Sequence, residues 1–459
     1  MHTYLIKNGY IINEGRKYYA DLLIKDGRIE KIAPNIDTKF AVKEINAEGL
    51  YVLPGCIDDQ VHFREPGLTH KANIQTESTA AVAGGVTSFM EMPNTNPPAL
   101  TQELLEEKYM IGSQHALANY SFFMGTSNDN YDEVMKTNEK KQSICGIKIF
   151  MGSSTGNLLV DNPLTLEKIF SGCEVLIATH CEEEKMIKEN LQALQQQKTL
   201  TAADHPIIRN DEVCFESSWK AIQYAQKFGS RLHILHISTA KELQLFTNLI
   251  PLKEKKITAE VCVHHLHFTA DDYEQMGNLI KCNPAIKAPH NKAALWEALL
   301  DNRLDVIATD HAPHTLAEKG FMRDAQTGKL VCNNADYLHA HAGLPLVQHS
   351  LLLMLYYVQQ GKISIEKVVE KMSHAVADCF QIKERGYLRE GYFADVVLVN
   401  PQQGITVTKD NLLYKCGWSP LEGTTFPMQI DKTFVNGHLV YANGSIDASV
   451  KGMRLAFNR

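Results

Sequence analysis

The sequence has no C-x-x-C pair among its ten cysteines, and it has no apolar run long enough to span a membrane. The scattered cysteines argue against a zinc knuckle or a thioredoxin-type motif and favour free thiols in a reducing compartment. Residues 344–358 form the longest apolar candidate, but they include Gln348 and His349, so we predict a buried helix there. The first residues also lack a basic segment followed by an apolar one, and we expect a cytoplasmic protein without a membrane anchor.

A concentration of positive charge is missing as well. The net charge is -7 over 459 residues, and no Lys/Arg cluster occurs along the chain. A protein that binds nucleic acid needs a basic surface, so this class of partner is not expected. An anionic small molecule is compatible with the composition, because a single arginine in a pocket outweighs a diffuse surface charge.

What the sequence does contain is a globular composition, with 44% hydrophobic and 22% charged residues, and a repeated pattern in its middle part. Apolar runs of strand length alternate there with longer amphipathic or polar segments, which is the pattern of βα units around a parallel sheet. Eight such runs occur, at residues 56–62, 86–94, 118–126, 145–152, 174–180, 232–238, 257–264 and 304–311. They predict a closed (β/α)8 TIM-type barrel, a fold whose chemistry lies at the C-terminal ends of its strands.

Both ends of the sequence are rich in short β runs. Asn8-Gly9 and Asp26-Gly27 are hairpin signals near the beginning, and a similar texture returns towards the end. Because chain ends often lie close together, we predict that they form one small flanking β-sandwich domain. The predicted division is a composite β domain of residues 1–53 with 387–459 and a catalytic barrel of residues 54–386.

The predicted strand ends carry polar side chains that bind metals or substrates. They are His62, Asn94, Lys148, His180, His236, His264 and Asp310. Imidazoles, a carboxylate and a lysine from distant parts of the chain would meet at one rim of the barrel, as a metal site there requires. His180 and His236 are neutral nitrogen ligands suited to zinc, and Asp310 is an oxygen ligand or a proton carrier.

Lys148 does not fit a metal site as an ammonium group. Its simplest interpretation is a salt-bridge partner or a substrate anchor. After reaction with carbon dioxide it would become an anionic carbamate with two oxygens, able to bridge two metals about 3.5–4 Å apart. The sequence leaves both interpretations open.

A metal centre at this rim would support hydrolysis of an amide-like carbonyl. Zinc lowers the pKa of bound water to about 7, so a metal-bound hydroxide would be the nucleophile. Asp310 would act as general base during the attack and as general acid towards the leaving nitrogen. An arginine among the remaining rim residues favours an anionic substrate. The residues expected to face the substrate are Arg64, Asn94, Asn283 and His314.

The motifs around these residues resemble those of the dihydroorotases, within the cyclic amidohydrolase group. The matching stretches are HFREPG at His62, MPNTNP at Met92, IKIFM at Ile147, HCEEE at His180, HILHIST at His233, AEVCVHHL at Ala259, CNPAIK at Cys282 and ATDHAPHT at Ala308. The resemblance implies reversible cyclisation of N-carbamoyl-L-aspartate to L-dihydroorotate, a step of pyrimidine biosynthesis. This small-molecule substrate is the partner that the family resemblance implies, and a homo-oligomer stays open.

The resemblance also implies roles for individual residues. It implies one or two zinc ions per subunit, held by His62, an N6-carboxylated Lys148, His180, His236 and Asp310. It implies substrate contacts by Arg64, Asn94, Asn283 and His314.

One position departs from the resemblance. Dihydroorotases usually carry D-x-H-x-H, and Gln60 stands here in place of the first histidine. An amide oxygen is a weaker zinc ligand than an imidazole. Three outcomes therefore stay open: a binuclear centre completed by Gln60 or water, a single metal at Lys148, His180 and His236, and a pseudoenzyme.

Two further functions stay open beside the main hypothesis. One is another cyclic-amide hydrolase of the hydantoinase or allantoinase type, which resembles the sequence less well because it typically lacks an arginine at the position of Arg64. The other is a non-catalytic scaffold. Among the neighbouring histidines, His233 and His311 are interpreted as packed or supporting residues, whereas His264 and His265 stay ambiguous.

Overall fold

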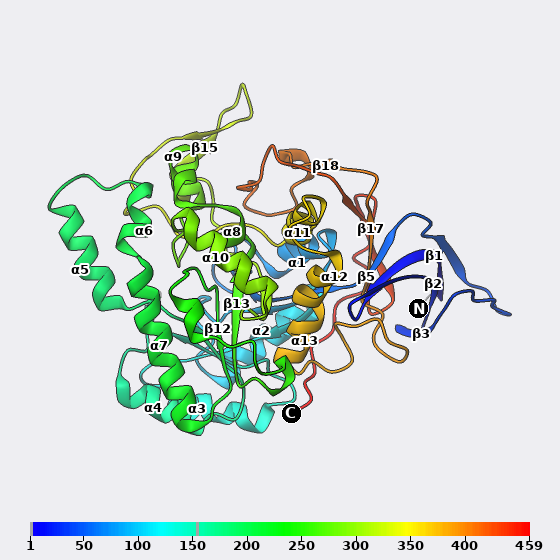
Figure 1. Ribbon diagram of the computed structural model, residues 1–459, viewed down its shortest axis with the longest axis horizontal. Helices are drawn as coiled ribbons and strands as arrows, with labels where there is room; N and C mark the ends of the chain where they lie inside the picture. Colours follow the sequence, from blue (N-terminus) through cyan, green and yellow to red (C-terminus); the bar gives the residue numbers. More distant parts are fainter. Residues whose placement is uncertain (1–2, 153–155) are drawn as a thin grey trace.

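The computed structural model describes residues 3–152 and 156–459, and its centre is a closed parallel barrel (Figure 1). Each barrel strand pairs in parallel with the next, and the bridge between Val61 and His311 closes the circle. The strands are β6 (Cys56–Val61), β7 (Val86–Glu91), β8 (Asn119–Phe122) continued by β9 (Met124–Gly125), β10 (Ile147–Phe150), β11 (Ile177–His180), β12 (Leu232–Ile234), β13 (Ile257–Cys262) and β14 (Val306–Ala308). Each lies within one of the eight predicted runs, so the predicted barrel is confirmed.

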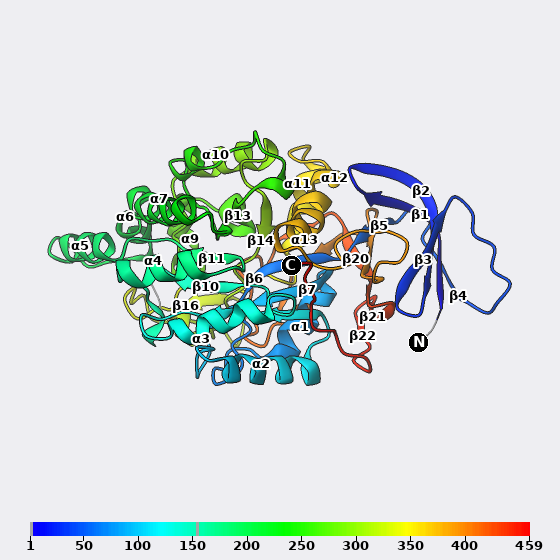
Figure 2. The same cartoon turned by 90° about the horizontal axis from the view of Figure 1, so that it is seen from below.

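Helices cover the outside of the barrel (Figures 1 and 2). α1 (Ile74–Ala83) begins after the capping side chain of Asn73 and ends at Gly84, and α7 (Asp211–Phe228) ends at Gly229 with φ of +69°. Only glycine adopts this left-handed conformation without a steric penalty, so Gly229 is suited to end α7. The other α-helices are α2 (Gln102–His115), α3 (Tyr131–Met135), α4 (Pro163–Gly172), α5 (Glu184–Gln195), α6 (His205–Ile208), α8 (Val263–His267), α9 (Tyr273–Met276), α10 (Pro289–Leu300), α11 (Ser350–Gln359), α12 (Ile365–Val369) and α13 (Ala375–Phe380).

Strands from both chain ends share one nine-stranded sheet beside the barrel. β5 (Tyr51–Pro54) joins the two ends, because it pairs in parallel with β1 (Tyr4–Asn13) and antiparallel with β17 (Val396–Asn400). The remaining strands are β2 (Arg16–Lys25), β3 (Arg28–Ala33), β4 (Lys43–Asn46), β20 (Gln429–Val435), β21 (His438–Ala442) and β22 (Ser445–Ile446). This confirms a flanking β domain built from both ends, while the residue limits proposed for the two domains stay a prediction.

The predicted hairpin at Asn8-Gly9 is wrong. β1 runs straight through these residues, and its register against β2 shifts between Ile6 and Gly9. Asn8 has φ of +63°, so the left-handed residue that we took for a turn forms a bulge within the strand. The chain turns instead at Glu14 and Gly15, whose φ angles are both positive, whereas the turn predicted at Asp26-Gly27 is present between β2 and β3.

The buried helix predicted over 344–358 begins late. Its first residues form an extended segment in which Leu344 bridges to His311, and α11 starts only at Ser350. The Leu344 carbonyl oxygen accepts a hydrogen bond from the Ala312 amide, so this segment extends the edge of the barrel mouth. No helix in the described ranges is long and apolar enough to cross a bilayer.

Two short hairpins complete the chain. β15 (Phe321–Arg323) pairs with β16 (Leu330–Cys332), and β18 (Ile405–Thr406) pairs with β19 (Thr425–Phe426). The β15–β16 hairpin projects from the top of the molecule in Figure 1.

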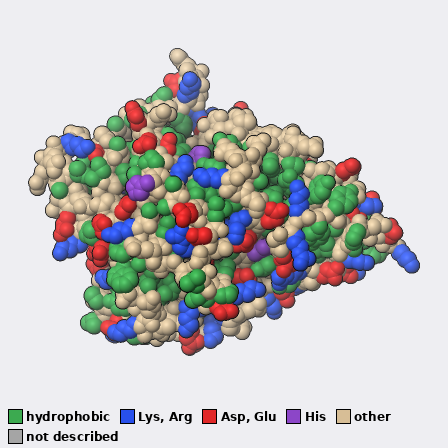
Figure 3. Space-filling view, in the orientation of Figure 1, with side chains coloured by type: hydrophobic (Ala, Val, Ile, Leu, Met, Phe, Trp, Pro, Cys, Tyr) green, Lys and Arg blue, Asp and Glu red, His purple; other side chains and the backbone are tan. Residues whose placement is uncertain are grey.

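All ten cysteines lie in the described part of the chain and are free thiols, as predicted. On the face shown in Figure 3, acidic and basic side chains are interspersed.

Candidate active site

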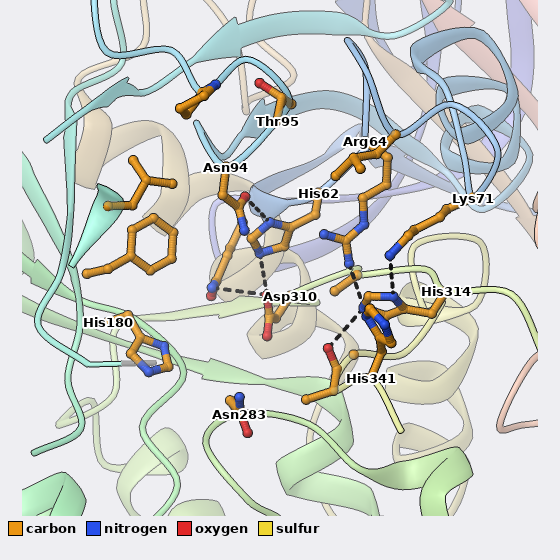
Figure 4. Close-up of a pocket in the computed structure, with 18 of the residues that line it drawn as sticks. His62, Arg64, Lys71, Asn94, Thr95, His180, Asn283, Asp310, His314 and His341 are labelled. Atoms are coloured by element: carbon orange, nitrogen blue, oxygen red, sulfur yellow. Dashed lines mark hydrogen bonds and ion pairs between the residues drawn. The ribbon is translucent and has the colours of Figure 1, made fainter. Parts of the chain in front are cut away.

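A cavity of about 510 Å³ opens at the C-terminal ends of the barrel strands. Its wall contains every residue predicted to bind metal or substrate, namely His62, Arg64, Asn94, Lys148, His180, His236, Asn283, Asp310 and His314. These residues are spread over about 250 positions of the sequence, and the barrel brings them to one place (Figure 4). His264 is buried in α8 and is not among the described lining residues.

Three of these cavity residues have an unusual backbone. The φ angles are +67° at Arg64, +42° at His236 and +47° at Asp310. Side chains other than glycine rarely adopt this region, and each instance costs about 1–3 kcal/mol. All three follow a strand end, so the strain bends the chain where a side chain must turn into the cavity.

The imidazoles of His180 and His236 face each other. His180 Nδ1 lies 2.9 Å from His236 Nε2, while His180 Nε2 lies 2.9 Å from Glu182 Oε2. Arg209 pairs with the same carboxylate, and although burial opposes it, this guanidinium and His180 hold the pKa of Glu182 at about 2. An ionised carboxylate only accepts, so His180 Nε2 carries the proton and His180 Nδ1 presents its lone pair towards His236. Burial lowers the pKa of both imidazoles, which favours their neutral, ligating forms.

Lys148 is a buried amine beside these rings. It is 1% exposed, and its Nζ has no hydrogen-bond partner among the described residues. Burial lowers its pKa to about 7, so a large fraction is uncharged near neutral pH. A neutral amine is the form that reacts with carbon dioxide. A buried amine and two neutral imidazoles in one cavity fit a bound divalent metal, because they supply nitrogen lone pairs, and Lys148 Nζ and His236 Nδ1 have no hydrogen-bond partner among the described residues.

Asp310 lies beside two hydrogen-bonding groups on another part of the wall. Its Oδ1 lies 2.9 Å from His62 Nε2 and accepts from Gln60 Nε2 at 3.2 Å. Burial alone would raise the pKa of Asp310, but the hydrogen bond from His62 outweighs it, and the pKa is lowered. His62 Nδ1 in turn lies 2.7 Å from Asn94 Oδ1. Asn94 therefore contacts the imidazole of His62 as well as the cavity.

A separate group of cationic and neutral side chains lies on the opposite side of the opening (Figure 4). Arg64 Nη2 lies 3.0 Å from His314 Nε2, and Lys71 Nζ lies 3.1 Å from His314 Nδ1. Burial and Arg64 hold the pKa of His314 well below its usual value, so this ring is neutral. Lys71 also pairs with Glu318 over 3.0 Å. Gly343 lets the neighbouring loop approach, since a Cβ there would lie 2.4 Å from the Ala312 carbonyl oxygen.

Arg64 itself has no carboxylate partner among the described residues. It is 7% exposed, and its hydrogen bonds run to the Pro313 carbonyl oxygen and to His314. Burial lowers its pKa to about 10, which still leaves the guanidinium charged at neutral pH. A buried, unpaired cation is costly, and the geometry of the guanidinium matches a carboxylate.

Comparison with known proteins identifies the family. The model of the amidohydrolase family matches residues 51–440. The chain belongs to this amidohydrolase family. This confirms the family resemblance predicted from the motifs.

Curated amidohydrolase relatives carry two different names. The chain is 30% identical to a dihydroorotase of Methanosarcina acetivorans over 96% of this chain and 93% of that protein. It is 29% identical to an allantoinase of Deinococcus radiodurans over 98% of both chains. Among solved structures, the L-hydantoinase of Arthrobacter aurescens has a TM-score of 0.89 at 24% identity, covering 99% of this chain and all of that one. This last likeness concerns the fold alone.

The amidohydrolase site contains residues that the sequence did not reveal. Glu182 and Arg209 orient His180, and Lys71 adds a cation to the wall. The position of Glu182, two residues after His180 in HCEEE, was a usable signal, because alternate residues of an extended chain share a face. Lys71 lies in the loop between β6 and α1, where no periodic pattern predicts its direction.

A buried charge cluster lies against the back of the amidohydrolase site. His233 Nε2 lies 3.1 Å from Asp59 Oδ2 and 3.8 Å from Glu260 Oε2. Burial alone would lower the pKa of His233, but the neighbouring carboxylates of Asp59 and Glu260 raise it to about 9. The His236 amide donates to Glu260 Oε1 at 2.9 Å, so the cluster supports the imidazole pair. His311, which we interpreted as a supporting residue, lies 2.8 Å from Glu77 Oε2.

Proposed function

We propose that this protein is a zinc-dependent dihydroorotase that interconverts N-carbamoyl-L-aspartate and L-dihydroorotate in pyrimidine biosynthesis. The observation that carries the proposal is the buried Arg64 guanidinium, which faces the same cavity as Lys148 and pairs with no carboxylate of the described residues. Dihydroorotate bears a carboxylate on its ring, whereas hydantoin and allantoin are neutral. A substrate that brings its own anion would satisfy this arginine.

The proposed zinc ligands are His180, His236 and Lys148 in its carboxylated form, with His62 and Asp310 as the further ligands that the family resemblance implies. Zinc would supply a Lewis acid for the amide carbonyl and lower the pKa of water. The closeness of the two imidazoles, the unpartnered His236 Nδ1 and Lys148 Nζ, and the lowered pKa of Lys148 support this assignment.

The remaining residues would bind the substrate and move its protons. Arg64 and His314 would hold the ring carboxylate, with Asn94 and Asn283 at the other polar edges of the substrate. In the hydrolytic direction, Asp310 would take a proton from water as the carbon–oxygen bond forms. It would then give that proton to the ring nitrogen as the carbon–nitrogen bond breaks. Cyclisation reverses these steps and releases water.

The test is a comparison of substrates on one zinc-loaded preparation. We expect kcat/KM for L-dihydroorotate to exceed that for hydantoin, dihydrouracil and allantoin by roughly 10³-fold or more, because a neutral ring leaves Arg64 unpaired. A matched Arg64→Met variant keeps side-chain length and should lose most of this preference. Preferred turnover of allantoin or hydantoin would overturn the dihydroorotase proposal in favour of another cyclic-amide hydrolase. Bound zinc without turnover of any of these rings would favour the scaffold.

A further inference from the structure

The side chain of Gln60 ends beside Asp310 in the cavity. Gln60 is 2% exposed, and its Nε2 donates to Asp310 Oδ1 at 3.2 Å. The same oxygen lies 2.9 Å from His62 Nε2. A carboxylate oxygen has two lone pairs, so one atom of Asp310 already accepts from two N–H groups of the protein.

The contact with Asp310 fixes the orientation of the Gln60 amide. At the other end, Gln60 Oε1 lies 3.9 Å from Cys262 Sγ, whose single S–H is closer to Glu260 Oε1 at 3.3 Å. A flipped amide would set its carbonyl oxygen against the carboxylate of Asp310 and its NH2 group against the thiol. Two acceptors would then face each other. The amide therefore presents its nitrogen, which has no lone pair for a metal, towards Asp310.

The two parts of the cavity wall thus differ in what they offer a cation. At His180 and His236, one hydrogen bond joins the two rings over 2.9 Å, while Lys148 Nζ and His236 Nδ1 have no hydrogen-bond partner among the described residues. At His62 and Asp310, the facing atoms are already joined by hydrogen bonds, and Gln60 adds the positive end of an N–H dipole. A cation there would have to displace both hydrogen bonds and lie beside that dipole.

We propose that this cavity binds one metal ion tightly, through His180, His236 and Lys148, and that Gln60 prevents tight binding of a second ion between His62 and Asp310. Three protein ligands are what a catalytic zinc site with an open position requires. The inference rests on the metal-dependent hydrolase function proposed above. It also gives Gln60 a positive role: its amide holds the Asp310 carboxylate in place as a proton carrier, so that Gln60 is a positioning residue.

The test counts metal ions rather than turnover. The full-length protein is reconstituted with zinc and bicarbonate, freed of excess metal and analysed for bound zinc, and a chelator competition then measures each affinity. His180→Asn protein provides the background from surface histidines. We expect one zinc per chain for the wild type, with any second ion bound about 100-fold more weakly or worse. Two ions per chain with affinities within tenfold of each other would overturn the inference.

Substitutions at Gln60 examine its part directly. Gln60→His restores an imidazole, and Gln60→Glu places a carboxylate oxygen where Nε2 now lies with almost no change in shape. We expect a second tightly bound zinc in at least one of them, and a count of one in both would refute the blocking role. Gln60→Leu removes the hydrogen bond without adding a ligand, so it should still hold one zinc while kcat falls and KM changes little. An unchanged kcat in that variant would refute the positioning role.

These results separate the inference from the proposed function. A protein with one zinc that prefers neutral rings would refute the dihydroorotase assignment and leave the metal count standing. A protein that binds two zinc ions tightly and turns over dihydroorotate would refute the metal count and support the dihydroorotase assignment.

Discussion

Two sides of one cavity differ in the charge of their buried side chains. The side formed by Lys148, His180 and His236 has been stripped of charge, since burial lowers the pKa of all three groups. The side formed by Arg64, Lys71 and His314 keeps its positive charge, and the carboxylate of Glu318 there already pairs with Lys71. The first side offers lone pairs to a cation, and the second offers N–H donors to an anion.

The difference between the two sides follows from the chemistry of the residue types. A buried lysine or histidine escapes the cost of burial by losing its proton. A buried arginine does not, because its pKa stays far above neutrality, and the pKa of Arg64 is still about 10. Arg64 must therefore find an anion, whereas Lys148 is free to react as an amine. The comparison predicts that substitutions on the first side affect metal binding and that substitutions on the second side affect substrate binding alone.

The largest effect is expected from Lys148→Ala. Without this amine the cavity loses a ligand for the metal, so bound zinc should fall to background and turnover should drop by roughly 10⁴-fold or more, the size of loss typical of an essential catalytic group. Metal analysis and steady-state kinetics on the same sample measure both.

Lys383→Ala, at an exposed lysine, controls for the loss of a charge. Partial rescue of Lys148→Ala by a short carboxylic acid would support the carbamate. An active, metal-free Lys148→Ala protein would refute the role of Lys148.

On the other side of the cavity, Arg64→Leu should separate substrate binding from metal binding. Leaving the substrate carboxylate unpaired in a buried site costs about 3–4 kcal/mol, so KM for L-dihydroorotate should rise by roughly 100-fold or more while zinc content stays unchanged. Arg64→Lys should recover only part of this loss, because a lysine cannot make the two parallel hydrogen bonds. Zinc loss in Arg64→Leu would break the division between the two sides.

Sequence patterns predicted the barrel and nine of the residues that line the cavity, but not the groups that orient them. The barrel was accessible because each strand is a short apolar run ending in a polar residue, as at His62 and His180. Contacts across the barrel have no such period. That Gln60 would direct its nitrogen towards Asp310, and that Arg209 would pair with Glu182, depends on three-dimensional neighbours far away in the chain.

The hairpin predicted at Asn8-Gly9 was wrong because pairing with neighbouring strands outweighed the local turn preference. Asn8-Gly9 has the composition of a hairpin turn, and Asn8 does adopt a positive φ. The strand nevertheless continues, because Tyr10 and Ile11 pair with β5 and extend the sheet. The sequence thus specified the conformation of one residue correctly without specifying its consequence for the chain.

A smaller effect is expected from Glu182, which orients the proposed metal ligand His180 but is not itself a proposed ligand. In Glu182→Gln the carboxylate that fixes the His180 tautomer becomes an amide of the same shape, so zinc affinity should fall by about 10–100-fold. Chelator competition measures this change. Glu183→Gln, at the adjacent and partly exposed residue, is the matched control. KM for the substrate should stay within a few-fold of wild type, and an equal loss in both variants would show that Glu182 has no special role.

The smallest effect concerns the buried cluster of Asp59, His233 and Glu260 behind the imidazole pair. This effect is expected in the free energy of unfolding rather than in activity. The neighbouring carboxylates of Asp59 and Glu260 overcome burial and raise the pKa of His233 to about 9, above the unfolded value of about 6.5. A raised pKa means that the folded state binds the extra proton, so this stabilisation is complete below about pH 6.5 and is lost as the pH rises through about 9. The free energy of unfolding of the metal-free protein should therefore fall by roughly 2–3 kcal/mol across this window.

The matched control for this pH dependence is the double variant Asp59→Asn/His233→Gln, which removes both charges of the pair and keeps polar side chains of similar size. Urea unfolding at pH 6.5 and 9.5 compares its pH dependence with that of the wild type, so that titrations elsewhere in the chain cancel. The double variant should lose most of the difference between the two pH values. If it keeps the full difference, His233 is not protonated in the folded state, and the support of His236 through Glu260 would depend on packing instead of charge.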